Sequence, residues 1–554
     1  MLKLGKTYQE LYSGFEWRLP DQFNIAYAVC DRHTGQDLSA LFEDFENSSR
    51  RWTFDELSVA SRRLANALAA LGLRKGDVAA IILPQSAATL IAHLAIYRIG
   101  AIALPLFSLF GSEAIIHRLQ DSSASVLITN DEGVDKISTL QGDLPALRHI
   151  ISTGAHRPQP ILGWDELMSS ASENHTIAQT KPSDPALLQY TSGTTGKPKG
   201  VLHAHHVLLG ILPGVELSHN FLPQAGDIMW TPADWAWGAG LLATLLPSLY
   251  HKVPVVARRF SKFDPELAAD LMVRQQVRNA FLPPTALRMM RQSMSSASLS
   301  RLKLRSITSG GERLGDEMLA WGQERLGVHI NEIFGQTEAN LVVFNSPSLM
   351  SCPVGSMGRA VPGHQVSIVD TDGTPLPPGN RGIIAVRAPD PVMFLGYFKQ
   401  PEATNGKFRN GWLLTGDVGD SDAEGNLFFR GRDDDIISSA GYRIGPDEVE
   451  NCILQHPAVS MVAVVGVPDD LRGEIVKAFV VPAADAEAGP NLERAIQAFV
   501  KQRLSPHEYP REIEFRSSLP LTITGKVMRR SLREEEANRE AGPADGNEIQ
   551  AGKQ

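Results

Sequence analysis

The sequence predicts a multidomain α/β protein. It comprises a large N-terminal domain with mixed or parallel sheets flanked by helices plus a β-rich subregion, and a small mobile α+β domain at the C-terminus. Three observations predict this class. The 554 residues exceed what one hydrophobic core usually supports. Buried-strand patterns alternate with helical patterns over the first half of the chain, as in largely parallel sheets. Near position 433 the character of the sequence changes and a compact α+β pattern begins.

The N-terminal part alternates helix and strand signals. Thr53 is a potential N-cap, and the apolar rhythm after it predicts a helix. The run 78–83 predicts a buried strand, 90–99 a helix and 100–105 another strand. The same alternation predicts further strands at 125–129, 253–257 and 305–308.

The remaining chain predicts a β-rich subregion and a small final domain. From Pro353 to Gly379 the sequence is dense in Pro, Gly and Asp, and 382–387 then reads as a strand, so a β-rich subregion is expected before position 433. Pro446 with the acids after it predicts a helix start. Strands at 461–465 and 477–481 and a helix at 492–501 follow. We therefore expect a large domain over 1–433, a small domain over 434–535 and a disordered, apolar-poor tail over 536–554.

Composition excludes several classes of function. The formal net charge of −9 argues against a nucleic-acid partner, which normally needs a basic face. The three cysteines lie far apart and form no disulfide or metal framework. No apolar run is long enough to span a membrane, and the N-terminus lacks the apolar core of a signal peptide. We expect a soluble cytoplasmic protein.

The most informative stretch is Y-T-S-G-T-T-G-K-P-K-G, residues 190–200. Its glycines let the backbone approach a ligand closely, while its hydroxyls and lysines supply donors and positive charge. A polyphosphate suits such a loop. The Walker pattern is not matched, because Pro198 follows Lys197 where a hydroxyl residue would hold magnesium. On the loop alone, an ordinary surface turn remains the alternative.

Five further motifs follow in a fixed order. They are S-G-G-E (309–312), F-G-Q-T-E (334–338), T-G-D (415–417), G-R (431–432) leading to G-Y-R (441–443), and T-G-K (524–526). Together with the loop they resemble the adenylate-forming superfamily, which includes acyl-CoA synthetases, luciferases and the adenylation domains of peptide synthetases. The resemblance runs from about Trp52 to Arg530, and residues 229–246 most resemble medium-chain acyl-CoA synthetases.

The resemblance implies a two-step reaction that uses ATP, Mg²⁺ and coenzyme A. A carboxylate attacks the α-phosphate of ATP to give an acyl-adenylate and pyrophosphate, and a thiol then takes the acyl group and releases AMP. Such phosphoryl chemistry depends on positioning and charge neutralisation. No partner beyond the acid, ATP and CoA is implied.

The resemblance also assigns roles to residues. Phe334 would stack on adenine, Thr337 would contact phosphate, Glu338 would bind magnesium, and Lys526 would reach the acyl carboxylate and α-phosphate. Asp417 would accept hydrogen bonds from both ribose hydroxyls, with Arg432 as its companion. The remaining nucleotide-site residues are Thr191, Ser192, Gly193, Thr194, Thr195, Gly196, Lys197, Gly311, Glu312, Arg313, Gly335, Gln336 and Arg443.

The two half-reactions imply two arrangements of the small domain, since Lys526 is needed only for the first. The family rotates this domain about a hinge residue, here Asp434. Gly441 would let a pantetheine arm pass close to the backbone. Arg472 and Lys477 would contact CoA phosphates.

The acid pocket is expected around Trp237, Gly238 and Gly335. In acetyl-specific relatives a tryptophan stands where this chain has Gly335, so acetate should be a poor substrate here. An open apolar slot favours a medium-chain, branched or aromatic acid. We expect Gly335→Trp to shift preference toward acetate or propionate.

Two other functions remain open. A stand-alone adenylation enzyme could load a carrier protein in place of CoA, and a retired ligase fold could serve as a nucleotide or acyl-adenylate sensor. The presence of Lys526, Glu338 and Asp417 disfavours the sensor. The trio His203, His205 and His206 is not expected to bind a metal, and Cys452 is expected only to pack against apolar neighbours.

Overall fold

The computed structural model places two compact units along the chain. It describes residues 2, 6–36, 38–45, 48–137, 142, 144–156, 158–191, 198–312, 314–432, 435, 437–439, 442–469, 472–504, 508–522 and 525–540. The large unit contains Met1–Thr415 and Asp420–Phe428, and the small unit contains Gly416–Gly419 and Phe429–Gln554. The division therefore falls slightly earlier than the expected boundary at 433.

One sheet of the large unit is mainly parallel. Among the described residues it runs in the order β19-β9-β8-β4-β3-β5-β6-β7, and only the β8–β9 and β9–β19 pairs are antiparallel. Its strands are β3 (Val78–Ile82), β4 (Ile102–Pro105), β5 (Val126–Thr129), β6 (His149–Ser152), β7 (Leu162–Gly163), β8 (Pro185–Tyr190), β9 (Gly200–Ala204) and β19 (Gly396–Tyr397).

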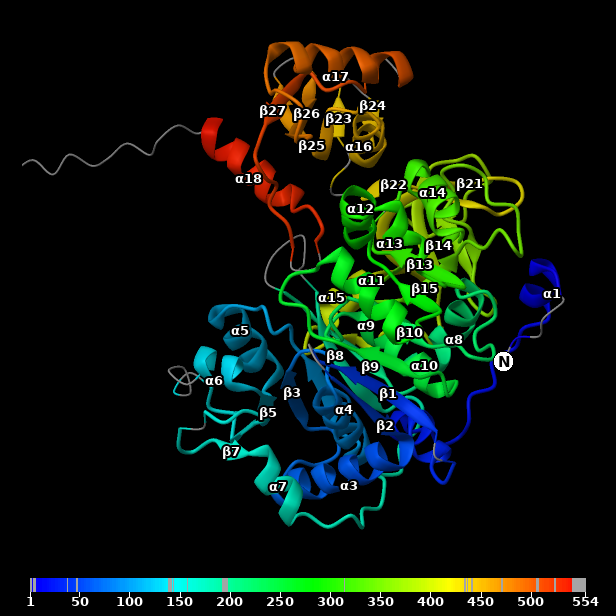
Figure 1. The fold of residues 1–554 in the computed structure, drawn as a ribbon. Helices are drawn as coiled ribbons and strands as arrows, with labels where there is room; N and C mark the ends of the chain where they lie inside the picture. Colours follow the sequence, from blue (N-terminus) through cyan, green and yellow to red (C-terminus); the bar gives the residue numbers. More distant parts are fainter. Residues whose placement is uncertain are drawn as a thin grey trace, which may run out of the picture. The chain divides into compact units, whose positions relative to one another are not determined.

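A second sheet of the large unit runs in the order β16-β15-β14-β13-β12-β10-β11-β1-β2 over the described residues (Figure 1). It is parallel from β14 to β1, with antiparallel strands at both edges. Its strands are β1 (Ser39–Asp44), β2 (Ser49–Thr53), β10 (Met229–Trp230), β11 (Val255–Ala257), β12 (Asn279–Phe281), β13 (Ser306–Gly310), β14 (Ile330–Gln336), β15 (Asn340–Phe344) and β16 (Arg359–Ala360).

Helices cover these sheets. The predicted cap is present, since Thr53 and Glu56 form a capping box at the start of α3. The helix α8 is buried at every position and packs on β14 and β15, and its side chains are mostly apolar, with Glu216 and Ser218 as buried polar residues. The helices of this unit are α1 (Tyr8–Ser13), α2 (Ile25–Val29), η1 (Asp31–His33), α3 (Phe54–Ala70), α4 (Ala87–Ile99), α5 (Ser112–Ser122), α6 (Asp131–Ile137), α7 (Trp164–Ser170), α8 (Val207–Ser218), α9 (Gly238–Gly240), η3 (Leu241–Leu245), α10 (Leu246–Tyr250), α11 (Pro265–Arg274), α12 (Pro284–Ser293), α13 (Ser296–Ser300), α14 (Asp316–Trp321), η4 (Gly322–Leu326) and α15 (Pro401–Gly406).

The expected β-rich subregion forms a third sheet. Its strands are β17 (Val366–Val369), β18 (Gly382–Arg387), β20 (Phe408–Arg409), β21 (Trp412–Ser421) and β22 (Leu427–Arg432). The predicted strand at 382–387 coincides with β18. Since β21 and β22 carry the chain from one unit into the other, the division passes through this sheet.

The small unit is a twisted sheet with helices around it. Its strands are β23 (Ile437–Ser439), β24 (Tyr442–Ile444), β25 (Val459–Asp469), β26 (Gly473–Pro482) and β27 (Glu512–Phe515), and its helices are α16 (Pro446–Leu454), α17 (Pro490–Arg503) and α18 (Arg529–Glu540). Cys452 is buried in the apolar cluster between α16, α17 and the sheet, as expected.

The predicted tail is wrong over its first residues. Helix α18 continues to Glu540. The side chain of Glu536 is buried, and its carboxylate binds the Lys477 ammonium at 2.5 Å. Composition alone missed the last turns of this helix, because charged side chains there pair with residues distant in the sequence, such as Lys477. Residues 541–554 lie outside the described residues.

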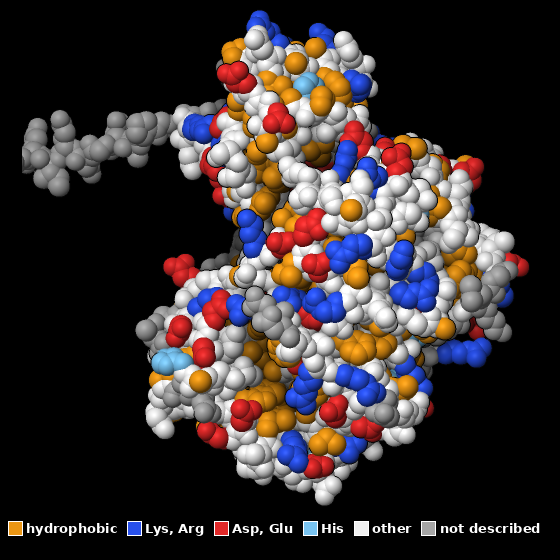
Figure 2. All heavy atoms as spheres, in the orientation of Figure 1, with side chains coloured by type: hydrophobic (Ala, Val, Ile, Leu, Met, Phe, Trp, Pro, Cys, Tyr) orange, Lys and Arg blue, Asp and Glu red, His pale blue; other side chains and the backbone are white. Residues whose placement is uncertain are grey.

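Surface charge and helix length were also compared with expectation. On the face shown in Figure 2, acidic and basic side chains are interspersed. Of the helices that the structure describes, none combines the length and the hydropathy that crossing a bilayer requires.

Candidate active site

The predicted phosphate loop connects two antiparallel strands. Tyr190 at the end of β8 pairs with Gly200 at the start of β9, and the Thr191 amide donates to the Lys199 carbonyl at 3.0 Å. The structure therefore describes the stem of the loop. Its central residues, Ser192, Gly193, Thr194, Thr195, Gly196 and Lys197, lie outside the described residues, and their phosphate contacts stay a prediction.

The stem is anchored to α5 by a contact that no sequence motif indicated. The Tyr190 hydroxyl donates to Asp121 Oδ2 at 2.6 Å, and the Lys399 ammonium donates to the Asp121 carbonyl at 2.8 Å. Burial, reinforced by this carboxylate, raises the pKa of Tyr190 well above its ordinary value, so the phenol stays a hydrogen-bond donor. The loop therefore begins from a fixed point.

Glu338 lies beside the outgoing strand of the loop. Its carboxylate is buried, and Oε1 accepts a hydrogen bond of 2.6 Å from the Tyr397 hydroxyl. Tyr397 belongs to β19 and pairs with Val201 of β9, so the tertiary fold brings Glu338 to the loop stem. The Lys199 ammonium lies 5.1 Å from the centre of the Tyr397 ring. No sequence motif indicated Tyr397.

This arrangement fits a magnesium ion. Magnesium is usually held by one or two carboxylates together with substrate phosphates, rather than by an all-protein cage. Glu338 supplies one oriented carboxylate next to the phosphate loop, and no cluster of three His, Cys, Asp or Glu side chains able to hold a metal occurs among the described residues. When bound, the ion would neutralise phosphate charge.

The histidines after the loop have separate surroundings. Burial lowers the pKa of His203 to about 4 although the Thr337 backbone opposes the shift, so its ring is neutral and lies near the predicted phosphate contact Thr337. His205 Nδ1 accepts from the Ile25 amide at 3.3 Å, whereas His206 Nδ1 donates to the Pro391 carbonyl at 2.7 Å. They do not converge on one point.

The predicted adenine-binding residues lie at the carboxyl ends of neighbouring parallel strands. β13 and β14 pair side by side, with Gly310 opposite Ile333. Gly311 follows β13 with φ of +97°, a conformation that favours glycine. Phe334 comes next on β14, which places the two motifs together at the sheet edge where α/β folds bind ligands. Arg313 lies outside the described residues.

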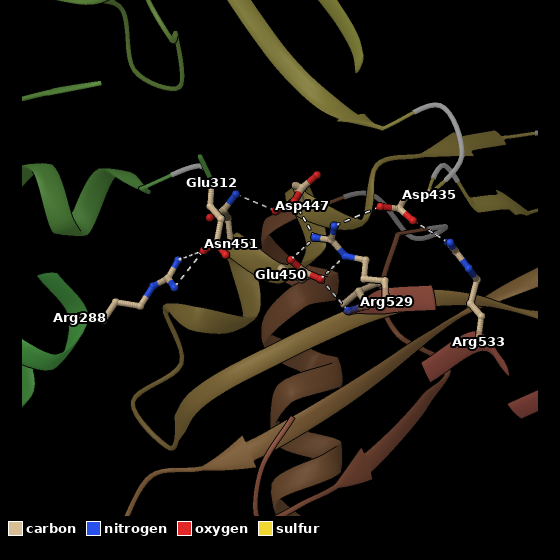
Figure 3. Close-up of polar contacts among 9 residues, drawn as sticks. Arg288, Glu312, Asp435, Asp447, Glu450, Asn451, Arg529 and Arg533 are labelled. Atoms are coloured by element: carbon tan, nitrogen blue, oxygen red, sulfur yellow. Dashed lines mark hydrogen bonds and ion pairs between the residues drawn. The ribbon is translucent and has the colours of Figure 1, made fainter. Parts of the chain in front are cut away.

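Two side chains of these motifs are held by polar contacts. Both terminal nitrogens of Arg288 donate to Glu312 Oε2 at 3.3 Å (Figure 3). Gln336 Nε2 donates to the Thr415 carbonyl at 3.2 Å. The contact with Thr415 ties the F-G-Q-T-E motif to the strand that carries the T-G-D motif.

Within the small unit, Asp417 and Arg432 form an ion pair. Asp417 Oδ1 lies 3.7 Å from Arg432 Nη1, and the aspartate side chain is 10% exposed against 38% for the arginine. The pairing follows because β21 and β22 are neighbouring strands. The structure thus places the two residues together, while their contact with ribose remains a prediction.

The predicted acid pocket contains an aromatic pair. The Trp237 ring meets the Phe281 ring edge to face, with centres 5.7 Å apart. The Trp237 amide donates to the Asp234 carbonyl, and the Asp234 carboxyl accepts from the Ala236 amide. Burial raises the pKa of Asp234 to about 6. These bonds form a turn that holds the backbone of Trp237. The segment η3, which follows soon after, is π-helical, and π-helical turns are frequent at functional sites.

Gly238 has room beside it. A Cβ placed there would lie 3.4 Å from Gln189 Oε1 and 3.8 Å from Asn340 Oδ1, which is ordinary contact. Gln189 Oε1 is buried without a hydrogen-bond partner, and its amide nitrogen donates to the Ala236 carbonyl. Sequence reasoning missed Gln189, although it stands directly before the phosphate loop.

Gly335 has a different role from the one expected. A Cβ at this position would lie 1.3 Å from the Asn340 carbonyl oxygen and 2.3 Å from its carbon, both backbone atoms of the β14–β15 turn. With this backbone, a side chain at 335 would enter the turn rather than the acid slot. The expected effect of Gly335→Trp on acid preference is therefore withdrawn.

We expect Gly335→Ala to destabilise the protein by about 3 kcal/mol, because the turn must open to admit the methyl group. Thermal unfolding measures this directly. Gly238→Ala is the matched control, since it adds the same methyl group with no contact shorter than 3.4 Å. Equal melting temperatures for the two variants would contradict the steric argument.

The small unit carries Lys526 on a closed loop. Its amide donates to Thr522 Oγ1 at 3.0 Å, and its carbonyl accepts from the Thr522 amide at 2.7 Å. Asp434, the predicted hinge, and Gly441 lie outside the described residues, as does the side chain of Arg443. Arg472 lies 3.7 Å from Asp469 and is partly exposed.

The suggested CoA contact of Lys477 is wrong. Its ammonium is buried and lies 2.5–3.5 Å from the carboxylates of Glu536, Glu514 and Glu512. These carboxylates raise the pKa of Lys477 against the opposing effect of burial. The lysine is thus fully engaged within the small unit.

Comparison with known proteins identifies the class. The model of the AMP-binding enzyme family matches residues 30–398, and that of the AMP-binding enzyme C-terminal domain matches residues 448–526. The chain belongs to the AMP-binding enzyme family. It is an AMP-forming acid–thiol ligase of the acyl-CoA synthetase type, with ATP, Mg²⁺ and CoA as cofactors and co-substrates.

Individual relatives cover nearly the whole chain. Acetyl-coenzyme A synthetase of Bacillus subtilis is 34% identical over 97% of this chain and 96% of its own. Human acyl-coenzyme A synthetase ACSM2B, named a mitochondrial protein, is 36% identical over 94% of this chain and 92% of its own.

Solved structures of similar proteins include two ligases of aromatic acids. One is the anthranilate CoA ligase AuaEII with anthranoyl-AMP, which has a TM-score of 0.85 at 29% identity and covers 94% of this chain and 99% of its own. The other is a benzoate CoA ligase from Burkholderia xenovorans, which has a TM-score of 0.82 at 26% identity. It covers 92% of this chain and 100% of its own.

Proposed function

We propose that this acyl-CoA synthetase activates a medium-chain, branched or aromatic acid in preference to acetate. The observation that carries the proposal is the Trp237–Phe281 ring pair together with the neighbouring Gly238, where an added Cβ would make only ordinary contacts. Each methylene that a longer acid buries against these rings adds about 0.8 kcal/mol.

The similar proteins support both larger and small acids. Anthranilate and benzoate ligases share the fold, whereas the Bacillus subtilis relative is named an acetyl-coenzyme A synthetase. A preference for a larger acid is therefore expected from Trp237, Phe281 and Gly238 and not from Gly335. For the individual residues, we assign magnesium to Glu338, ribose to Asp417, phosphate handling to the loop 191–197 and the adenylation lysine to Lys526.

The proposal is tested by pyrophosphate release with acids from acetate to octanoate, with branched acids and with benzoates, each with and without CoA. We expect CoA-dependent turnover concentrated on one group of acids larger than propionate. Highest efficiency with acetate would overturn the proposal. Pyrophosphate release that stalls with CoA and proceeds with a carrier protein would instead identify a carrier-loading enzyme.

A substitution of Gly238 tests the location of the pocket. We expect Gly238→Ala to lower kcat/KM for the preferred acid about tenfold relative to an acid one methylene shorter, because a methyl group is worth roughly 1–3 kcal/mol in an apolar pocket. The added methyl fits without displacing the backbone, so the melting temperature should change little. An unchanged ratio of efficiencies would place the pocket elsewhere.

We further propose a cytoplasmic location. The three cysteines are unpaired thiols in the structure, as suits a reducing compartment. The human relative is named mitochondrial, so immunoblotting of fractionated cells, with organelle markers as controls, decides between the two compartments.

A further inference from the structure

The described residues on either side of Lys526 are joined by backbone contacts and lead directly into helix α18. Besides the two hydrogen bonds between Thr522 and Lys526, Leu521 and Val527 form an antiparallel bridge. The Met528 amide then donates to the Pro520 carbonyl at 2.9 Å. These bonds fix the backbone of Lys526 relative to Arg529, the first residue of α18. Whatever holds Arg529 therefore also holds the lysine loop.

The Arg529 guanidinium is bound by three carboxylates (Figure 3). Its Nη2 donates to Asp447 at 2.7 Å and to Glu450 Oε2 at 2.6 Å, and its Nε donates to Glu450 Oε1 at 2.9 Å. Its Nη1 reaches Asp435 Oδ2 at 3.4 Å. The side chain is only 15% exposed. The two bonds to Glu450 form the bidentate geometry that a lysine could not reproduce.

These carboxylates come from two other segments of the small unit. Asp447 and Glu450 lie on α16, and the Val464 amide of β25 donates to Glu450 Oε1 at 2.7 Å. Asp435 immediately follows the predicted hinge residue in the sequence, and its other oxygen accepts from Arg533 of α18 at 2.7 Å. One guanidinium thus joins the lysine loop, the α16 helix and the chain next to the hinge.

The electrostatics make Arg529 the centre of this cluster. Burial raises the pKa of Glu450 to about 7, with Asp447 adding to the shift and Arg529 opposing it. Loss of Arg529 would raise the pKa of this carboxyl further and so favour its neutral form, while Asp435 would keep its bond to Arg533. A variant without the guanidinium can therefore keep its fold while losing the link to α16.

We propose that Arg529 is a positioning residue for Lys526, which holds the lysine loop against α16 and Asp435 in the geometry needed for adenylation. The proposal rests on the adenylation role proposed for Lys526. A displacement of about 1 Å at a reacting group costs on the order of a hundredfold in rate. The half-reaction that uses Lys526 should therefore be affected, and thiol transfer should not.

The other end of α18 provides a matched control. Lys477 is also buried among carboxylates and binds Glu536, seven residues beyond Arg529 in the sequence. Lys477→Met removes a buried cation of strand β26 that binds the same helix in the same unit, without touching the bonds around Lys526. A purely structural role for Arg529 would give both variants the same pattern of loss.

The experiment compares Arg529→Gln, Arg529→Lys, Glu450→Gln and Lys477→Met in two assays. One measures pyrophosphate formation without CoA, and the other measures acyl-CoA formation from supplied acyl-adenylate. We expect Arg529→Gln to lose about a hundredfold in the first and less than about threefold in the second, with Arg529→Lys and Glu450→Gln intermediate. Equal losses in the two assays, or the pattern of Lys477→Met, would overturn the proposal. If Arg529→Gln does not fold, the two milder variants decide by the same criterion.

A double variant separates this proposal from the role of Lys526. If Arg529 acts through the lysine, adding Arg529→Gln to Lys526→Ala should lower adenylation no further. Additive losses would mean that Arg529 acts independently of Lys526 and would refute the inference alone. Intact adenylation in Lys526→Ala would refute the proposed role of the lysine, and the inference with it.

Discussion

Replacing Lys526 by alanine should lower the rate of acyl-adenylate formation about a hundred- to thousandfold, equivalent to roughly 3–4 kcal/mol of transition-state stabilisation. The ammonium is the cation assigned to the acyl carboxylate and the α-phosphate, where negative charge gathers as the new bond forms. Because the Lys526 amide and carbonyl bind Thr522 through the backbone and Oγ1, the loop keeps its shape without the side chain.

Two assays are needed to interpret this variant. Pyrophosphate formation from acid and ATP should fall, whereas acyl-CoA formation from supplied acyl-adenylate should stay within a few-fold of the parent protein. The Lys501→Ala variant on α17 serves as the control for loss of a lysine elsewhere in the small unit. Equal loss in both half-reactions would remove the assigned role.

Replacing Glu338 by glutamine should also have a large effect, with adenylation falling at least about a hundredfold at a fixed magnesium concentration, since the substitution removes the carboxylate that Tyr397 orients near the stem of the phosphate loop. The glutamine has nearly the same shape and still accepts the Tyr397 hydrogen bond, so stability should be preserved. Titration of the reaction with MgCl₂ measures the expected rise in the concentration required.

Tyr397→Phe provides a graded comparison for Glu338. It keeps the carboxylate but removes the 2.6 Å hydrogen bond that orients it. Loss of such an orienting partner typically lowers metal affinity roughly ten- to a hundredfold. We therefore expect a smaller magnesium effect than for Glu338→Gln. A normal magnesium requirement in both variants would show that the metal is bound elsewhere.

Helices and strands could be predicted from the sequence where the local signals, such as caps and apolar runs, all indicated the same element. The cap at Thr53, the buried strands β3 and β4 and the Pro446 start of α16 depend on patterns within a few residues, and all three regions fold as expected. The order of short motifs likewise indicated the family, because glycines, hydroxyls and charges must recur where backbone approaches phosphate. The predicted disordered start of the tail failed because α18 depends on partners such as Lys477, distant in sequence.

The sequence by itself determined the class of chemistry, because the phosphate loop, the F-G-Q-T-E motif and the T-G-K motif stand in an order that resembles the adenylate-forming family. Only the tertiary structure decided which groups orient them. Tyr397 reaches Glu338, and Arg529 reaches Asp435 and Glu450, through strand pairing and helix packing. It also decided that Gly335 accommodates the Asn340 backbone. Contacts between residues distant in the sequence depend on how several helices and strands pack together, and a local sequence pattern does not predict this packing.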